Sequence, residues 1–401
     1  MKEVRPLRAY ANVALGRQRS PQHEEGPHIT PYLRAANVKD GALDLSDVKE
    51  MNFEPSEQAV FGLQPGDVLV TEGSGSLSAV GAACVWSGEL RGTICFQNTL
   101  LRLRPRPSTD ARFLAWWCRH AFADGIFASI ATGANIFHVS ADRVRSLPMS
   151  YLPPDRQRAI ADFLDTETAR IDAVITKKRR LIDLLEESLG SFVRHRLSTV
   201  EPKLPLKRRW IVVDCKHRTP DYVANGYPVV SPGDVTPGRL DLSRAHRFVG
   251  QEDLADLADD LRRPRRGDII YSRNASIGIA SFVDTDEPFC MGQDVCRITS
   301  RDQDQLFLTY VLNSVGIDQL DEQKVGSTFS RVNVAQILEL EMPSPTPEVQ
   351  RALAREFETR CAVHNSTVGL LERQVSLLHE RRQALITAAV TGDLDGSGAA
   401  A

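Results

Sequence analysis

The sequence lacks the features that mark several common protein classes. Its seven cysteines form no C-x-x-C pair and no cluster with histidine of the kind that holds zinc. We therefore expect no zinc site, and reduced, mostly buried thiols of the kind found in cytoplasmic proteins. The first ten residues contain no apolar stretch typical of a signal peptide, and the longest uncharged run, residues 73–88, is too short to cross a bilayer. We expect a cytoplasmic chain with no membrane association.

Motifs for nucleotide binding and catalysis are absent as well. Residues 73–78 read GSGSLS, but Ser78 stands where the third glycine of G-x-G-x-x-G would be, and no Gly-Lys-Ser/Thr follows. The chain has no G-x-S-x-G motif around these serines and no Asn/Asp-Pro-Pro-Tyr/Phe tetrapeptide of the adenine methyltransferases. Asp214, Cys215 and His217 could form a catalytic cluster, although a DNA-contacting or structural loop fits them better. We expect no catalytic residue, no metal and no cofactor in this chain.

The sequence does contain an internal repeat that covers the whole chain. Gly66-Asp67 recurs as Gly267-Asp268, 201 positions later, and Gln157 recurs as Gln350, 193 positions later. Further matches in the same order pair Asp44 with Asp241, Gln97 with Gln293, Phe113 with Phe307, Gly133 with Gly326 and Pro148 with Pro343. A period of this length is too long for a solenoid. It indicates a tandem duplication of a complete domain and the segment that follows it.

Each repeat begins with short apolar runs separated by turn residues, which predict strands. Such runs are residues 68–70, 80–86 and 99–103 in the first copy and 268–271 and 277–283 in the second. Helical spacing of apolar residues in 113–122 and 306–315 predicts a helix packed on those strands. We therefore predict an α+β fold with two globules, each followed by a long helix. The predicted segments are residues 1–152, a helix at 153–199, residues 200–346, a helix at 347–392, and a disordered tail at 393–401.

The two long helices are predicted from their boundaries and their apolar spacing. Pro153-Pro154 suits a helix start, and no Gly or Pro interrupts the chain until Gly190. The second helix is expected to run from Pro347 to a C-cap at Gly392. One apolar stripe alone would more often be the core of a helical domain, but two such stripes on duplicated segments favour an antiparallel, coiled-coil-like pair. The predicted seam consists of Ile160, Leu164, Ile171, Val174, Leu181, Leu185 and Phe192 on the first helix and Leu353, Phe357, Leu371, Val375, Leu378 and Leu385 on the second.

Residues 151–172, YLPPDRQRAIADFLDTETARID, resemble the central region of the specificity subunits of type I restriction-modification enzymes, and Lys177-Lys178 to Glu186 continue the likeness. Residues 38–70 and 214–222 resemble the starts of two of their target-recognition domains. The resemblance extends over essentially the whole chain. It is weaker in the distal helix, where Val349 precedes Gln350 in place of the family's Glu.

The resemblance implies a non-catalytic subunit that recognises double-stranded DNA. Each target-recognition domain would read one half of an asymmetric, bipartite target, and the paired helices would set the unread spacer between the half-sites. The implied partners are two methyltransferase subunits, which would use S-adenosylmethionine, and any cleavage would belong to restriction subunits with nuclease and translocase activity, whose presence the sequence leaves open. The alternative is a coiled-coil adaptor that binds proteins and never contacts DNA, and salt-dependent duplex binding would separate the two.

DNA binding requires cations for phosphates and forked donors for base edges, and arginine supplies both. The net charge of −3 gives no global basic signal, and a bias of the source genome is an alternative explanation of the excess of Arg over Lys. Basic residues nevertheless cluster within residues 203–218 and 262–266. The candidate DNA-contacting residues are Arg17, Arg19, Ser74, Ser76, Gln97, Lys216, His217, Arg218, Arg273, Asn274, Gln293, Ser327, Thr328 and Arg331.

Overall fold

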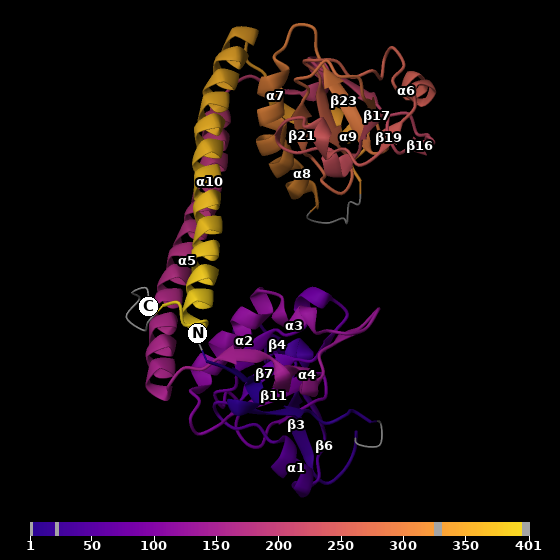
Figure 1. Ribbon diagram of the computed structural model, residues 1–401. Coiled ribbons are helices and arrows are strands. Elements are labelled where there is room, and N and C mark those ends of the chain that lie inside the picture. Colours follow the sequence, from indigo (N-terminus) through magenta and orange to yellow (C-terminus); the bar gives the residue numbers. More distant parts are fainter. Residues whose placement is uncertain (1–2, 21–23, 325–330, 395–401) are drawn as a thin grey trace. The chain divides into compact units, whose positions relative to one another are not determined.

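The computed structural model describes residues 3–20, 24–324 and 331–394. The chain divides into two compact units (Figure 1). Unit 1 comprises residues 1–178 and 373–401, and unit 2 comprises residues 179–372. The long helices α5 (Pro154–Ser198) and α10 (Pro347–Val390) each contribute to both units. Each unit therefore contains one globule, the first part of the long helix that follows it, and the last part of the other long helix.

The globule of unit 1 contains two main sheets. The antiparallel sheet runs in the order β2 (Ala11–Leu15), β11 (Leu100–Pro105), β7 (Val68–Thr71) and β9 (Ala83–Val85). The smaller sheet contains β10 (Cys95–Phe96), β3 (Ile29–Leu33) and β6 (Lys49–Asn52). Its other elements are β4 (Val38–Lys39), β5 (Ala42–Leu43), α1 (Pro55–Phe61), β8 (Gly73–Ser74), α2 (Ala111–Ala123), α3 (Ile126–Ser129), β12 (Phe137–His138) and α4 (Ala141–Ser146).

The globule of unit 2 repeats this plan. Its larger sheet runs in the order β15 (Ile211–Asp214), β23 (Val295–Thr299), β20 (Ile269–Ser272), β21 (Ala280–Phe282) and β18 (Gly238–Arg239). The smaller sheet contains β16 (Tyr222–Val223), β19 (Phe248–Val249), β17 (Tyr227–Val230) and β22 (Cys290–Met291). Its helices are α6 (Gln251–Leu257), α7 (Gln305–Val311), α8 (Ile317–Lys324) and α9 (Val334–Leu338). The α+β fold class, the strands and the predicted helices α2 and α7 are confirmed.

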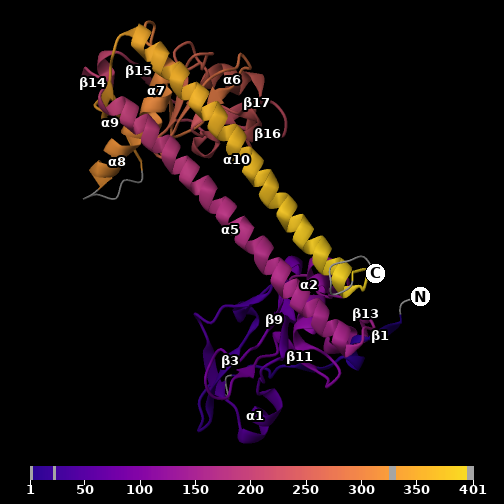
Figure 2. The same ribbon diagram turned by 90° about the vertical axis from the view of Figure 1, so that its left-hand side faces the viewer.

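A pair of short strands closes each globule. In unit 1, β1 (Val4–Pro6) pairs antiparallel with β13 (Pro148–Ser150) next to the start of α5 (Figure 2). In unit 2, β14 (Lys203–Pro205) pairs in the same way with β24 (Glu341–Pro343). The first and last strands of each globule therefore lie side by side where the long helix begins.

The repeated Gly-Asp motif forms the same turn in both units. Gly66 and Gly267 have φ values of +93° and +92°, a left-handed conformation that favours glycine. Asp67 accepts the N–H of Gln64 and a two-bond contact from Arg104, at 2.7 Å for each bond. Asp268 accepts the N–H of Arg265 and a bond from the buried Arg297 at 2.9 Å. The motif recurs because it closes the turn before β7 and β20 and binds the neighbouring strand.

The ends of the long helices complete the core of each globule. In unit 1, Ile160 and Leu164 of α5 and Ile386 and Val390 of α10 belong to the same apolar cluster as the sheet and α2. In unit 2, Leu353 and Phe357 of α10 and Val193 and Leu197 of α5 occupy the corresponding places. Each of these unit 2 residues lies 193 positions from its unit 1 counterpart, which is the offset found between Gln157 and Gln350.

Contacts within each unit establish that α5 and α10 pair antiparallel. Asp172 lies 2.7 Å from Arg382 and Lys178 lies 2.5 Å from Gln374, both in unit 1. Arg196 pairs with Glu356 at 2.7 Å in unit 2. The residue number on α10 falls as the number on α5 rises, which confirms the predicted orientation.

The predicted seam is partly wrong on α5. Val174 is 38% exposed and Leu181 is 45% exposed, whereas Ile175 is buried. After Ile171 the buried stripe advances by four residues rather than three, so that Ile175 and the half-buried Ile182 face inward. The other seam residues are buried or half-buried: Ile160, Leu164, Ile171, Leu185, Phe192, Leu353, Phe357, Leu371, Val375, Leu378 and Leu385.

All seven cysteines are free thiols in the structure, and only Cys361 is not fully buried. Burial raises the pKa of Cys95 and Cys290 to about 12, which keeps both thiols protonated and unreactive. Among the helices of the described part of the chain, none combines the length and the apolar character needed to span a bilayer.

His120 on α2 gives unit 1 a pH-dependent stability. Burial lowers the pKa of this imidazole, whose Nδ1 lies 3.1 Å from Oγ1 of Thr387 on α10. The unfolded chain, with an ordinary histidine pKa of about 6.5, therefore binds the proton more readily than the folded chain. The free energy of unfolding should fall as the pH drops below about 6.5. Urea unfolding at about pH 7.5 and pH 5.5 should show a smaller loss in His120→Gln than in the original chain, and equal losses would contradict this assignment.

Candidate nucleic-acid interface

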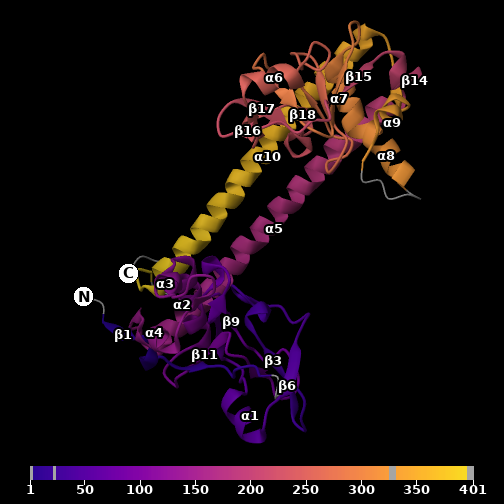
Figure 3. The same ribbon diagram turned by 90° about the vertical axis from the view of Figure 1, so that its right-hand side faces the viewer.

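A cleft of about 740 Å³ lies in unit 2 where β17 and β22 end. Figure 3 shows β16 and β17 close to α6 on this part of the globule. The cleft is lined mainly by polar side chains that can donate or accept hydrogen bonds. We call it the unit 2 cleft, and its lining consists of Thr219, Tyr222, Ser231, Pro232, Gly233, Asp234, His246, Arg247, Asn274, Ala275, Gln293 and Asp294.

Two backbone positions of the unit 2 cleft are strained. Ala275 and Asp294 have φ values of +54° and +63°, and they are the only non-glycine residues with positive φ in the described part of the chain. Such conformations cost about 1–3 kcal/mol each and persist where the surroundings hold them. Strain of this kind concentrates at functional sites. Because two strained residues line the same cleft, we take this cleft as the leading candidate site of unit 2.

The carboxylate of Asp294 organises the side chains around it. Its Oδ1 lies 2.8 Å from Nε of Arg331, and its Oδ2 accepts a hydrogen bond of 3.1 Å from Nδ2 of Asn274. The amide of Gln293 donates to Oγ1 of Thr219 at 3.0 Å. The structure thus brings together three predicted contact residues, Asn274, Gln293 and Arg331. Ser327 and Thr328 lie outside the described residues.

Unit 1 has a cleft of about 450 Å³ at the corresponding strand ends. In both units the smaller sheet contains one parallel pair, β3 with β10 and β17 with β22. We call it the unit 1 cleft, and it brings together the predicted Arg19 and Gln97 with Ser20, Glu24, Tyr32, Arg34, Lys49, Glu50 and Met51. The two clefts therefore occupy equivalent places but differ in their side chains.

The strand registers correct two of the sequence matches between the repeats. Phe96 lies opposite Leu33, the last residue of β3, and Met291 lies opposite Val230, the last residue of β17. The residue that follows is Gln97 in unit 1 and Gly292 in unit 2. Gln97 therefore corresponds to Gly292 and not to Gln293. Pro148 pairs with Pro6, whereas Glu341 pairs with Pro205 in the second copy. Pro148 therefore corresponds to Glu341 rather than to Pro343.

Several predicted basic contacts are engaged inside the protein. Arg273 is 2% exposed and its guanidinium lies 2.5 Å from Asp214. Arg17 is also buried, bonding Glu57 at 2.7 Å and the carbonyl of Asn52 at 2.9 Å. Neither side chain is presented for a direct DNA contact, which corrects the prediction for both. Their sequence context, basic and near a loop, did not reveal that the fold places Asp214 beside Arg273 and Glu57 beside Arg17.

The basic stretch after β15 is neutralised by α6. Lys216 pairs with Asp256, and Arg218 pairs with both Asp253 and Asp256. The hydrogen bond from Lys216 lowers the pKa of Asp256, so this carboxylate stays charged. These two cations therefore contribute less to a phosphate-binding surface than their sequence positions predict. Arg19 in unit 1 is similarly paired with Glu24 at 2.8 Å, although both side chains are exposed.

His217 closes a small cluster with Asp214 and Cys215. One donor atom from each of the three residues lies within 4.8 Å of the others. The Arg273 cation already occupies the Asp214 carboxylate, and burial raises the pKa of Cys215. A metal ion would need the thiolate and an unshared carboxylate, so this donor set does not fit one. Within the cluster, Nε2 of His217 lies 3.3 Å from Oδ2 of Asp214.

Ser74 lies in β8, which pairs with β12, and Ser76 follows two residues later. Ser74 pairs with Phe137, and the exposed Ser76 bonds Ser78 through the hydroxyl groups at 2.8 Å. The bridge between Asn274 and Arg331 occupies the matching place in unit 2. The β8–β12 pair of unit 1 is thus the counterpart of the Asn274–Arg331 bridge beside Asp294.

Sequence reasoning missed several lining residues, including Arg34 and Lys49 in unit 1 and Tyr222, His246 and Arg247 in unit 2. The guanidinium of Arg247 lies over the Tyr222 ring, 5.2 Å from its centre. Lys49 begins β6 and Tyr222 begins β16, and the other three residues lie in the connections next to β3 and β19, where no sequence motif marks them. Only the pairing of the smaller sheet brings them together.

Comparisons with known proteins find relatives of this chain. Residues 209–360 match the family model described as type I restriction modification DNA specificity domain. The chain is 24% identical to the type I restriction enzyme StySPI specificity subunit of Salmonella potsdam, over 91% of this chain and 82% of that protein. It is 22% identical to the EcoKI specificity subunit of Escherichia coli, over 61% of this chain and 54% of that protein.

Solved structures show the same fold. A chain from a study of complex assembly and conformational transition of the type I R-M system superposes with a TM-score of 0.73 at 16% identity, covering 98% of both chains. The HsdS subunit of Thermoanaerobacter tengcongensis gives a TM-score of 0.56 at 15% identity, covering 98% of this chain and 97% of that chain.

Proposed function

Since the chain belongs to the specificity subunits of type I restriction-modification enzymes, we propose that each of its globules reads one half of an asymmetric, bipartite DNA target. The observation that supports this proposal is that the two units have clefts at equivalent strand ends. Their common position follows from the duplication, and their different side chains give each unit its own half-site. The alternative of a protein-only adaptor is disfavoured, because an adaptor does not require polar clefts at equivalent strand ends of two duplicated domains.

The side chains of the clefts suit base recognition. An arginine fork reads the two acceptors of guanine, and the amide of Asn or Gln reads the donor and acceptor of adenine. The unit 2 cleft offers Asn274, Gln293 and Arg247, with Arg331 held at its rim by Asp294. The unit 1 cleft offers Gln97, together with Arg34 and Lys49, which both pair with Asp47 and keep their remaining donors for a base. Different donor patterns in the two clefts favour two unrelated half-sites.

The helices supply the other parts of the proposed function. Their antiparallel pairing sets the length of the unread spacer and holds two methyltransferase subunits. Val363, Leu370 and Leu377 support the second role, because these exposed apolar side chains repeat every seven residues along α10. Methyl transfer from S-adenosylmethionine belongs to those partners, and cleavage belongs to restriction subunits of the same complex.

The proposal is tested by co-expressing the chain with its methyltransferase partner and mapping modified adenines by long-read sequencing. We expect one motif of two short, different half-sites separated by unread positions. Modified adenines in a continuous motif, or a wild-type complex without salt-dependent duplex binding, would overturn the proposal.

Removing base-reading side chains from one cleft should affect one half-site. Asn274→Ala and Gln293→Ala should each reduce discrimination at the half-site read by unit 2 by about 1–3 kcal/mol, the usual contribution of a bidentate base contact. Competition binding against duplexes with single substitutions measures this loss. Arg244→Ala, at an exposed position that does not line the cleft, is the matched control and should leave both half-sites unchanged. Equal losses at both half-sites would contradict the assignment.

A further inference from the structure

Two buried glutamines occupy the same place in the two units. Gln157 and Gln350 are the fourth residues of α5 and α10, and each is 1% exposed. A buried amide is retained only when its donor and acceptor are both satisfied, since an unpaired polar group costs about 1–3 kcal/mol. Both glutamines meet this requirement with the same set of neighbouring segments.

Two hydrogen bonds of each side chain match between the units, and a third differs, since Nε2 of Gln157 donates to the carbonyl of Ser108 at 3.4 Å and Nε2 of Gln350 donates to Oε1 of Gln303 at 2.7 Å. Oε1 of Gln157 accepts the N–H of Asp110 at 2.9 Å, and Oε1 of Gln350 accepts the N–H of Asp304 at 2.9 Å. Their Nε2 atoms donate to the carbonyls of Leu152 at 2.8 Å and Pro345 at 2.9 Å, just before each long helix.

The residues bonded by the glutamines are themselves structural. The Asp110 carboxylate caps α2 by accepting the N–H groups of Arg112 and Phe113 at 2.9 and 3.0 Å. Asp304 caps α7 by accepting the N–H of Phe307 at 2.7 Å. Each glutamine therefore joins the first turn of a long helix to the capped start of the main helix of its own globule.

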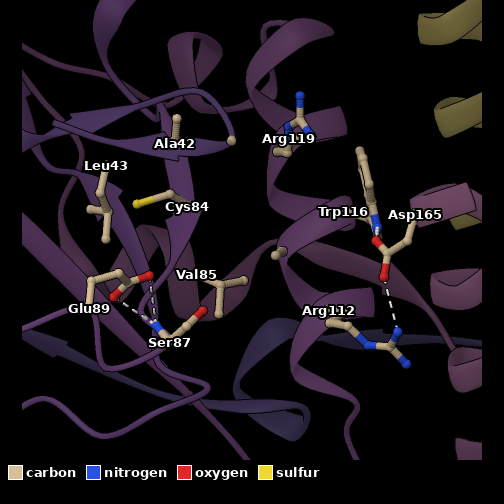
Figure 4. Close-up of a pocket in the computed structure, with 12 residues that line it drawn as sticks. Ala42, Leu43, Cys84, Val85, Ser87, Glu89, Arg112, Trp116, Arg119 and Asp165 are labelled. Carbon is tan, nitrogen blue, oxygen red and sulfur yellow. Dashed lines mark hydrogen bonds and ion pairs between the residues drawn. The ribbon is translucent and has the colours of Figure 1, made fainter. Parts of the chain in front are cut away.

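A second contact lies about two turns further along each long helix, and it differs between the units. In unit 1, Asp165 of α5 accepts bonds from Nε1 of Trp116 at 2.8 Å and from Arg112 at 3.0 Å (Figure 4). These residues lie beside a pocket of about 290 Å³ between α2 and the β4–β5 hairpin. In unit 2, Glu358 of α10 pairs with Arg239 of β18. The second contact varies, and the glutamine is the part shared by both units.

We propose that Gln157 and Gln350 are positioning residues, each of which fixes the angle at which one reading globule sits on its own long helix. The inference rests on the proposed function, because the angle matters for the placement of a cleft on one half-site. Loss of one glutamine leaves the cleft intact but lets its globule turn on the helix. The effect is therefore confined to one half-site, and the two glutamines serve as controls for each other.

The test compares Gln157→Met with Gln350→Met in the complex with the methyltransferase. Methionine has a similar volume and no hydrogen-bonding amide. We expect about tenfold weaker discrimination, the scale of one mismatched base pair, at the unit 1 half-site for the first variant and at the unit 2 half-site for the second. Hydrogen exchange should be faster at the Asp110 amide in the first variant and at the Asp304 amide in the second.

Faster exchange at the expected amide with both half-sites read as in the wild type would overturn the proposal. Equal loss at both half-sites would also overturn it. If the wild-type complex reads no bipartite target, the proposed function itself fails, and the exchange data still report whether the glutamines hold the helix starts. If a methionine variant does not fold, Gln157→Asn and Gln350→Asn replace it with the same expected results, because asparagine keeps the amide but is one methylene too short to reach both partners.

Discussion

Inserting four residues into both long helices is expected to lengthen the unread spacer of the DNA target by about two base pairs. Four residues add about 6 Å to a helix, close to the rise of two base pairs at about 3.4 Å each. The insertions belong after Lys178 in α5 and after Glu372 in α10, where the division between the units falls.

The natural motif should then be methylated at least about tenfold less than the lengthened one, since one mismatched base pair already costs about 1–3 kcal/mol. Coiled coils accommodate an added four residues by local unwinding, so the pair is expected to persist. Mapping of modified adenines in both strains measures the change. The matched control carries the insertion in α5 alone, which offsets the facing stripes and should abolish methylation. An unchanged spacer in the variant with both insertions would contradict the proposal that the long helices set the spacer length.

Replacing Arg297 with methionine is expected to lower the free energy of unfolding of unit 2 by about 3–5 kcal/mol, the cost of leaving a buried charge without its partner. The side chains of Arg297 and Asp268 are only 11% and 6% exposed, and their 2.9 Å bond lies beneath the turn of the repeated Gly-Asp motif. After the substitution, the Asp268 carboxylate loses its charged partner and keeps the hydrogen bond from the backbone N–H of Arg265.

Arg266→Met is the matched control on the same turn. Arg266 pairs with Asp284 and Asp286, but all three side chains are well exposed, and surface pairs contribute about 0–1 kcal/mol. Urea unfolding is followed by fluorescence in chains that carry Trp86→Phe, Trp116→Phe and Trp117→Phe, so that Trp210 of unit 2 is the one remaining tryptophan. Equal losses in the two variants would show that burial of the Asp268 pair does not determine its contribution.

The sequence was most informative where local rules act. Pro154 and Pro347 begin the long helices as predicted, and the repeated Gly66-Asp67 and Gly267-Asp268 motifs mark one turn in both units. These features depend on backbone preferences and on hydrogen bonds within a few residues. The duplication was readable because both copies retain them.

Predictions that depend on tertiary pairing were less successful. Val174 was assigned to the seam because apolar residues three or four positions after Ile171 both fit a helical stripe. Packing against the facing helix buries Ile175 and leaves Val174 exposed. Arg273 was predicted to contact DNA from its place in the sequence, whereas the fold pairs it with Asp214. The clefts depend on two-residue strands, whose register could not be read from a pattern that short.

The most direct test of the two-reader account is a chain whose second globule is replaced by a copy of the first. The antiparallel closing strands permit the exchange, since β1 and β13 can replace β14 and β24 next to the same helix ends. The helix residues that contact the globule, Val193, Leu197, Leu353 and Phe357, would be exchanged for their unit 1 counterparts. We predict that mapped adenines then define two copies of the unit 1 half-site in inverted orientation. Retention of the original asymmetric target would contradict the claim that each unit reads its own half.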